Sequence, residues 1–229
     1  MVYGSIALMF EHTKVLLCYA HPDDLVLSCA GTVAKLCQES YEVRALEITD
    51  GTQSDNKLAK ERIKESKRSA ELLGYTVDHL DFPDGRVQYD LELITAIENY
   101  LKEFKPRIVI THFPQVLGRG HQDHQAVASA VLNCARRSPF VKYILFSEPI
   151  SSFDDFTPNV FVDISRHFEQ KLQAVALHSS ESHKYYITRN TLSARGRFWR
   201  ELAVPVASQD DEYYEAFCLV KGVTSEFFK

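Results

Sequence analysis

The stretch Val15-Leu-Leu-Cys-Tyr-Ala20 is short, uninterrupted and apolar, and its residues are suited to a β-strand. Buried strands of parallel sheets have this composition because both of their faces are covered. A pattern of apolar residues at helical spacing follows almost directly, from Leu25 to Glu39. The sequence therefore predicts a buried strand that leads into a helix.

The same alternation continues along the chain. Further strands are predicted at 43–49, 107–113 and 143–147, with weaker candidates at 76–82, 159–164 and 215–221. Helices are predicted at 58–73, 91–104, 122–137, 166–178 and 191–202. Strands that alternate with helices favour an α/β fold with a mainly parallel sheet. No repeat or long linker interrupts the pattern, so we expect residues 1–229 to form a single domain.

Composition and charge narrow the class of protein. Of the 229 residues, 45% are hydrophobic and 25% are charged, which excludes disordered, collagen-like and coiled-coil chains. The formal net charge is −5, so a general attraction to nucleic acid or to an anionic membrane is not expected. No apolar run approaches about 18 residues and no signal peptide is visible. We therefore expect a cytoplasmic protein with no membrane span.

The cysteines are odd in number and contain no CxxC pair. They are Cys18, Cys29, Cys37, Cys134 and Cys218. Most lie in apolar runs, where cysteine behaves as a small hydrophobic residue. Because disulfides are rare in reducing compartments, we expect free thiols in the core.

Polar clusters follow the predicted strands at their carboxyl ends, where open parallel sheets bind ligands. His21-Pro-Asp-Asp24 follows the first strand, and Thr49-Asp-Gly-Thr-Gln53 follows the second. His112 lies at the end of the strand at 107–113, and His121-Gln-Asp-His124 comes after it. We expect these clusters to lie on one edge of the sheet.

His21 and Asp24 are three residues apart at the start of a predicted helix. Positions i and i+3 of a helix face the same way, so one divalent ion can take a nitrogen from His21 and an oxygen from Asp24. Asp23 then points elsewhere and is free to act as a base. The alternative is that the two adjacent carboxylates cap the helix and interact with its dipole.

His121 and His124 repeat this spacing, with Asp123 between them. One imidazole can supply a third ligand, while the other acts as an acid or electrostatic stabiliser oriented by a carboxylate. The alternative is a group of polar surface residues at a helix N-terminus. Three protein ligands leave a coordination position open, as in catalytic zinc sites, where zinc lowers the pKa of water toward about 7.

Ala20-His-Pro-Asp-Asp24 and His121-Gln-Asp-His124 resemble the two signature motifs of the LmbE-like (PIG-L) zinc deacetylases. That family includes N-acetylglucosaminylphosphatidylinositol deacetylase and the deacetylases of mycothiol and bacillithiol synthesis. Supporting similarities occur in family order at Thr49–Gly51, Leu58–Gly74, Phe82–Gly85 and Tyr214–Phe217. The resemblance implies a Rossmann-like three-layer α/β/α fold, in agreement with the alternation of strands and helices.

The resemblance also implies a role for each matching residue. The metal ligands would be His21, Asp24 and His124, which suit Zn²⁺ and also Fe²⁺. Asp23 would be the general base for the attacking water. His121 would stabilise the oxyanion or protonate the leaving amine, with Asp123 orienting it. Arg62 would contact the substrate.

The sequence departs from the family pattern at two positions. Gln122 stands where the second motif often has proline, a position that has no role in the mechanism. Ser180-Glu181 stands where the family usually has Ser-Gln, so no substrate contact is carried over from that segment. The membrane anchor of the eukaryotic enzymes is absent, which argues against a membrane lipid as the substrate.

Other residues are candidates for substrate contact. His112 can line the pocket, or it can bond to backbone at the end of its strand. Arg119, in Leu117-Gly-Arg-Gly120, can meet an anionic or sugar substrate, or remain a solvated loop residue. The aromatic pairs Tyr185-Tyr186, Tyr213-Tyr214 and Phe227-Phe228 suit sugar rings, although such residues more often pack in cores or interfaces.

These observations predict a zinc-dependent hydrolase that removes an N-acyl group, in the first place acetyl, from an N-acetylglucosamine-type amino sugar or its conjugate. The expected partner is that small molecule, and a homo-oligomer is compatible with the sequence. One alternative is a metal-dependent amidase or esterase with a non-sugar substrate. Another is a non-catalytic protein that binds a metal and a sugar conjugate. A nucleotide-binding protein is not favoured, because no GxGxxG follows the first strand.

Overall fold

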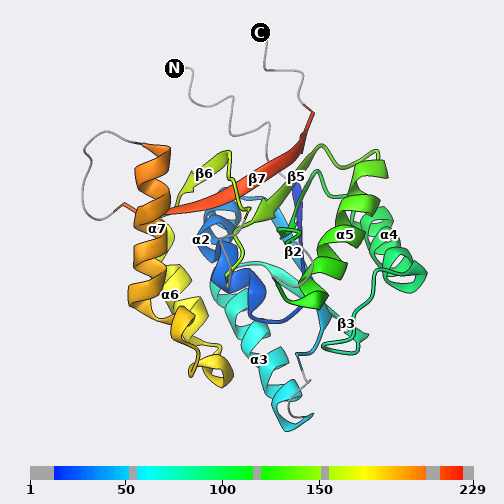
Figure 1. Ribbon diagram of the computed structural model, residues 1–229, viewed down its shortest axis with the longest axis horizontal. Coiled ribbons are helices and arrows are strands. Elements are labelled where there is room, and N and C mark those ends of the chain that lie inside the picture. Colours follow the sequence, from blue (N-terminus) through cyan, green and yellow to red (C-terminus); the bar gives the residue numbers. More distant parts are fainter. Residues whose placement is uncertain (1–12, 52–55, 116–119, 151–154, 205–211, 224–229) are drawn as a thin grey trace.

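The computed structural model describes residues 13–51, 56–115, 120–150, 155–204 and 212–223. One seven-stranded sheet runs through this part of the chain, and helices cover both of its faces (Figure 1). The Rossmann-like α/β fold with three layers and a mainly parallel sheet is therefore confirmed.

The strands lie in the order β3-β2-β1-β4-β5-β7-β6. The first five run parallel to one another, whereas β7 is antiparallel to both β5 and β6. Their bounds are β1 (Lys14–Tyr19), β2 (Glu42–Thr49), β3 (Thr76–Phe82), β4 (Ile108–His112), β5 (Tyr143–Ser147), β6 (Val160–Asp163) and β7 (Tyr214–Gly222). Each agrees with a strand predicted from the sequence to within one residue at either end.

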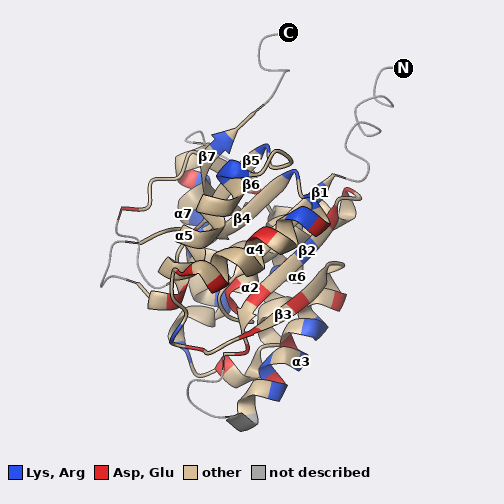
Figure 2. Ribbon diagram, turned by 90° about the vertical axis from the view of Figure 1, so that its right-hand side faces the viewer, with Lys and Arg blue, Asp and Glu red and all other residues tan. Residues whose placement is uncertain are grey.

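The helices form two layers. On one face lie α2 (Asp24–Gln38), α3 (Asn56–Leu73), α6 (Phe168–Ala176) and α7 (Arg189–Ala203). On the other lie α4 (Leu91–Phe104) and α5 (Gln122–Arg137). Three short 3₁₀ turns, Ser165–His167, Ser179–Glu181 and Tyr185–Ile187, flank α6 and precede α7. α3 carries charges of both signs (Figure 2), as expected for a solvated helix face.

β1 lies at the centre of the core. Val15, Leu17 and Tyr19 face the layer that contains α2, while Leu16 and Cys18 face α4 and α5. All five side chains are at most 1% exposed. Successive side chains of a strand point to opposite faces, and here both faces are covered. This explains why the run at 15–20 shows no alternation of polar and apolar residues.

All five cysteines have free thiols, as the sequence predicted. Cys18, Cys29 and Cys134 are buried, and Cys37 and Cys218 are half-buried. Within the described ranges, none of the helices combines the length and the hydropathy that a membrane span requires.

The order of the strands reverses at β1, which has β2 on one side and β4 on the other. Open α/β sheets bind their ligands at such a switch point, outside the carboxyl ends of the strands. The chain leaves β1 through residues 20–23 into α2, and it leaves β4 through residues 113–121 into α5. The two sequence motifs therefore meet at the switch point.

α2 is broken near its middle, where Cys29 has φ −144° and ψ 23°. The carboxylate of Glu215, in β7, accepts hydrogen bonds from the N–H groups of Gly31 (3.0 Å) and Thr32 (2.7 Å). Glu215 therefore caps the second half of α2, and Lys171, 2.7 Å away, balances its charge. The break separates this second half from the first turns of α2, which begin at Asp24.

Candidate metal and active site

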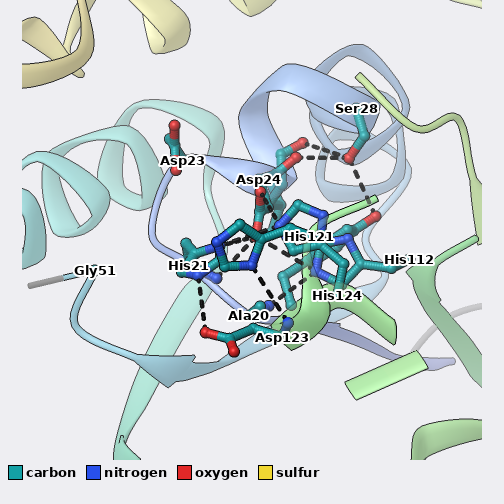
Figure 3. Close-up of polar contacts among 12 residues, drawn as sticks. Ala20, His21, Asp23, Asp24, Ser28, Gly51, His112, His121, Asp123 and His124 are labelled. Carbon is teal, nitrogen blue, oxygen red and sulfur yellow. Dashed lines mark hydrogen bonds and ion pairs between the residues drawn. The ribbon is translucent and has the colours of Figure 1, made fainter. Parts of the chain in front are cut away.

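Two segments that follow neighbouring strands meet around four imidazole rings (Figure 3). His21 follows β1 in the turn before α2, and Asp24 is the first residue of that helix. His112 ends β4, while His121 caps α5 and His124 lies in its first turn. Although 103 residues separate His21 from His124, their rings are in contact.

His21, Asp24 and His124 bring two ring nitrogens and the two oxygens of one carboxylate together. His21 Nδ1 lies 3.1 Å from His124 Nε2 and 3.2 Å from Asp24 Oδ2, and His124 Nε2 lies 3.2 Å from Asp24 Oδ1. Ligand atoms about 2.0–2.1 Å from a tetrahedral ion are about 3.3 Å apart. Both the separations and the donor types therefore fit a divalent ion such as Zn²⁺ or Fe²⁺.

The far side of the His21 ring faces two carboxylates. Its Nε2 lies 2.9 Å from Asp84 Oδ1 and 3.4 Å from Asp123 Oδ2. In the neutral ring that metal binding requires, a proton on Nε2 donates to these carboxylates and leaves the Nδ1 lone pair facing Asp24 and His124. Burial acts to lower the pKa of His21, but Asp24, Asp123 and Asp84 together raise it well above its ordinary value. The surroundings of this ring are thus strongly negative, as suits a bound cation.

The Asp123 carboxylate is fully buried. Besides facing His21, it accepts hydrogen bonds from the N–H groups of Gly85 (2.6 Å) and Val87 (3.1 Å). It therefore ties the start of α5 to the loop after β3. The sequence predicts that this carboxylate orients His121, but its oxygens contact His21 and the N–H groups of that loop. It is the backbone N–H of Asp123 that donates to His121 Nδ1, at 3.3 Å.

His121 lies at the rim of the cluster and is half-buried. Its ring stands edge-on to that of His21, with centroids 4.7 Å apart and an angle of 88°. Burial and the neighbouring His21 and His124 lower the pKa of His121. Because Nδ1 accepts the N–H of Asp123, the proton of the neutral ring lies on Nε2. His121 can therefore donate a hydrogen bond from Nε2.

Asp23 lies to one side of the imidazole cluster (Figure 3). Arg62, in α3, donates to Asp23 Oδ1 at 2.7 Å and to the carbonyl of Gly51 at 2.8 Å. Lys184 Nζ lies 3.9 Å from Asp23 Oδ2. Glu181 pairs with Lys184 and lies 3.5 Å from Arg62, which completes a ring of alternating charges. Of the two Asp23 oxygens, Oδ2 is the less tightly engaged.

The Thr49–Gly51 similarity has a structural reason. The Thr49 hydroxyl donates to the carbonyl of Ala20 at 3.0 Å and accepts the N–H of Gly51 at 3.2 Å. Gly51 has φ 69°, and a Cβ there would lie 2.5 Å from the guanidinium of Arg62. This segment therefore supports both the turn after β1 and the position of Arg62.

His112 is buried beside Asp24 and His124. Its Nε2 accepts the N–H of Ala20 at 2.9 Å, and its ring stacks on His124 with centroids 4.0 Å apart. Burial and then the charge of His124 lower the pKa of His112 to about 4, so the ring is neutral. The Nε2 lone pair of His112 is engaged by backbone, which is one of the two arrangements that the sequence left open. His112 contacts the site by stacking on the ring of His124.

The structure brings most of the predicted site residues together. Two residues, Arg119 and Asp84, have to be considered separately. Arg119 lies outside the described residues. Asp84, which contacts His21, was not among the candidates. The sequence could have indicated Asp84 as a site residue. Phe82-Pro-Asp-Gly85 comes at the end of β3 and thus lies at the same edge of the sheet as the other polar clusters.

Removing the Asp84 carboxylate is expected to weaken metal binding. Asp84→Ala should lower the affinity for Zn²⁺ by about 10–100-fold, because His21 loses the acceptor that orients its ring. Asp84→Asn keeps an acceptor oxygen and should lose less. Competition with a chromogenic chelator measures the affinity, and Asp81→Ala, an exposed carboxylate in β3, is the control. Unchanged zinc affinity in Asp84→Ala would show that Asp84 does not orient His21.

Comparison with known proteins identifies the family. The family model described as GlcNAc-PI de-N-acetylase (PIG-L) matches residues 16–135, which include both motifs. The diacetylchitobiose deacetylase of Thermococcus kodakarensis is 34% identical over 191 residues, which cover 75% of this chain and 72% of that protein.

Solved structures agree with this result. The N,N'-diacetylchitobiose deacetylase of Pyrococcus horikoshii has a TM-score of 0.72 and 25% identity, covering 94% of this chain and 88% of that one. The 4-carboxy-2-hydroxymuconate hydratase of Pseudomonas putida has a TM-score of 0.81 at 17% identity, covering 95% of this chain and 100% of that one, and shows the shared fold alone. The predicted resemblance is confirmed: the chain belongs to the GlcNAc-PI de-N-acetylase (PIG-L) family, and its enzyme class is that of the N-deacetylases.

Proposed function

We propose that this protein is a metal-dependent hydrolase that removes the acetyl group from an N-acetylglucosamine-type amino sugar or its conjugate. The observation that carries the proposal is the meeting of His21, Asp24 and His124, whose donor atoms lie 3.1–3.2 Å apart at the switch point of the sheet. Two relatives named as diacetylchitobiose deacetylases support the substrate class.

His21, Asp24 and His124 are the residues that would hold the metal, Zn²⁺ or Fe²⁺. Such an ion polarises the amide carbonyl and lowers the pKa of a water molecule. Burial acts to raise the pKa of Asp24, but His124, His112 and His21 lower it well below its ordinary value. Asp24 is therefore an ionised oxygen donor, as metal binding requires.

Three residues of the chain carry the proton transfers and charge stabilisation. Asp23 takes a proton from the attacking water at Oδ2 while Arg62 holds Oδ1. His121 donates from Nε2 to the carbonyl oxygen as negative charge develops there. As the new C–O bond forms and the C–N bond breaks, Asp23 delivers the proton that it took from water to the leaving amine. The products are acetate and the free amino sugar.

Direct substrate contacts stay predictions for Arg62, His112 and Arg119. The guanidinium of Arg62 already binds Asp23 and the Gly51 carbonyl, so its main role in this arrangement is to position Asp23. His112 acts on the site through its stacking on His124.

Metal removal and reloading test the proposal. Protein stripped with a chelator should release amine from N-acetylglucosamine, its methyl glycoside or diacetylchitobiose at least about 10²-fold more slowly than protein reloaded with one equivalent of Zn²⁺ or Fe²⁺. Amine and acetate are both quantified, and elemental analysis gives the bound metal.

The same panel includes N-acetylated simple amines and acetate esters, which separate the alternatives. Hydrolysis of these compounds but of no sugar would replace the proposal with an amidase or esterase acting on non-sugar substrates. Binding of metal and sugar by calorimetry, with no product from any compound, would instead indicate a non-catalytic binding protein.

A further inference from the structure

An apolar groove of about 950 Å³ lies beside the metal site, against α7. Its lining is rich in aromatic rings: Phe156, Phe161, Tyr185, Tyr186, Phe198 and Trp199. Tyr185 is 78% exposed and Phe198 is 53% exposed. Exposed apolar side chains that gather in one hollow are typical of an interaction site.

The groove adjoins the metal site at two places. Ile150 lines both the groove and the small cavity beside Asp24 and His124. At the second place, Lys184, which is 3.9 Å from Asp23 Oδ2, lies 5.7 Å from the centre of the Tyr186 ring. The groove and the metal site are therefore neighbours.

Hydroxyl groups make up most of the polar side chains among the described residues that line the groove, and they belong to Thr157, Tyr185, Tyr186 and Thr191. No carboxylate or side-chain amide occurs among the described residues that line it. Its one charged lining residue in that part of the chain, Arg195, lies 2.7 Å from Glu148 and donates to the carbonyls of Pro149 and Ile150. A sugar needs several directed hydrogen bonds, whereas an alkyl or aryl group needs only apolar area. The lining thus favours an apolar occupant.

We propose that this groove binds an apolar aglycone, an alkyl or aryl group carried by the amino sugar, and thereby selects such conjugates as substrates. The inference rests on the proposed function, because it places the amide of the same molecule at the metal site. The position of the groove next to that site favours a part of the substrate over a second copy of this chain, which the experiment below also examines.

Trp199 reports on the groove directly, because it is the single tryptophan of the chain. Its ring contacts Phe156 and Phe198, with centroids 5.6 and 4.8 Å apart. Hexyl β-D-glucoside, which has no amide, should change the tryptophan fluorescence in a saturable way, and methyl β-D-glucoside should not. This measurement requires neither metal nor turnover.

Turnover is compared for the hexyl and methyl glycosides of N-acetylglucosamine. The hexyl compound should have a kcat/KM at least about 10-fold higher, because its alkyl chain is transferred from water into the groove. Phe198 and Leu202 both line the groove, so in Phe198→Ser and Leu202→Ser this ratio should fall toward one. Leu91→Ser is the matched control, since Leu91 is 77% exposed on α4 in the opposite layer, and it should keep the wild-type ratio. Melting temperatures verify that each variant is folded.

Each outcome decides a separate claim. Equal turnover of the two glycosides, with no fluorescence change, would overturn the inference and leave deacetylation intact. A saturable fluorescence change without hydrolysis of either glycoside would support the apolar groove and contradict the proposed function. A wild-type dimer that Phe198→Ser converts to a monomer in sedimentation would make the groove an interface between copies and overturn the inference.

Discussion

Asp23→Asn is expected to lower kcat/KM for amide hydrolysis by about 10²–10⁴-fold while the protein keeps its metal. The substitution preserves the shape of the side chain and removes the proton acceptor. Metal retention is expected because Asp23 contacts Arg62 at 2.7 Å and is not among the described residues that gather around the ion site. Steady-state kinetics and elemental analysis on the same preparation measure both quantities.

Asp163→Asn is the matched control for this substitution. Asp163 is an exposed carboxylate at the end of β6 whose contacts are with Ser165. It should keep the wild-type rate and metal content. If Asp23→Asn turned over substrate at the wild-type rate, another group would have to accept the proton from water.

His124→Ala is expected to remove the metal and the activity together. His124 Nε2 lies 3.1 Å from His21 Nδ1 and 3.2 Å from Asp24 Oδ1, so the variant lacks one of three converging donors. The loss in metal affinity should exceed the roughly 10–100-fold that a supporting contact contributes. Chelator competition measures the affinity, and kcat/KM should fall in parallel at limiting metal.

His183→Ala serves as the control for His124→Ala, because His183 is an exposed histidine between two 3₁₀ turns. It should bind metal as the wild type does. A His124→Ala protein with wild-type affinity for Zn²⁺ would exclude His124 from the ligand set.

The positions of the strands and helices could be predicted because they follow from local chemistry. Val15 to Tyr19 read as a buried strand because both faces of β1 are covered. α3 ends at Leu73, directly before Gly74, whose φ of 88° suits glycine. The meeting of the two motifs was predictable as well, since ligands of open sheets bind at the carboxyl ends of the strands.

The features that could not be predicted depend on contacts between distant segments. The direction of β7 is one, because its apolar pattern is the same for a parallel and an antiparallel strand. The break of α2 at Cys29 is another, since it is capped by Glu215, 184 residues beyond Gly31. The ring formed by Asp23, Arg62, Glu181 and Lys184 joins three segments, and no spacing along the chain encodes it.

Anomalous diffraction from crystals grown with Zn²⁺ tests the central claim most directly, because it locates the ion among its ligands. The account predicts one strong peak about 2.0–2.1 Å from His21 Nδ1, His124 Nε2 and an Asp24 oxygen. A peak bound by other side chains, or no peak between these three residues at saturating zinc, would contradict it.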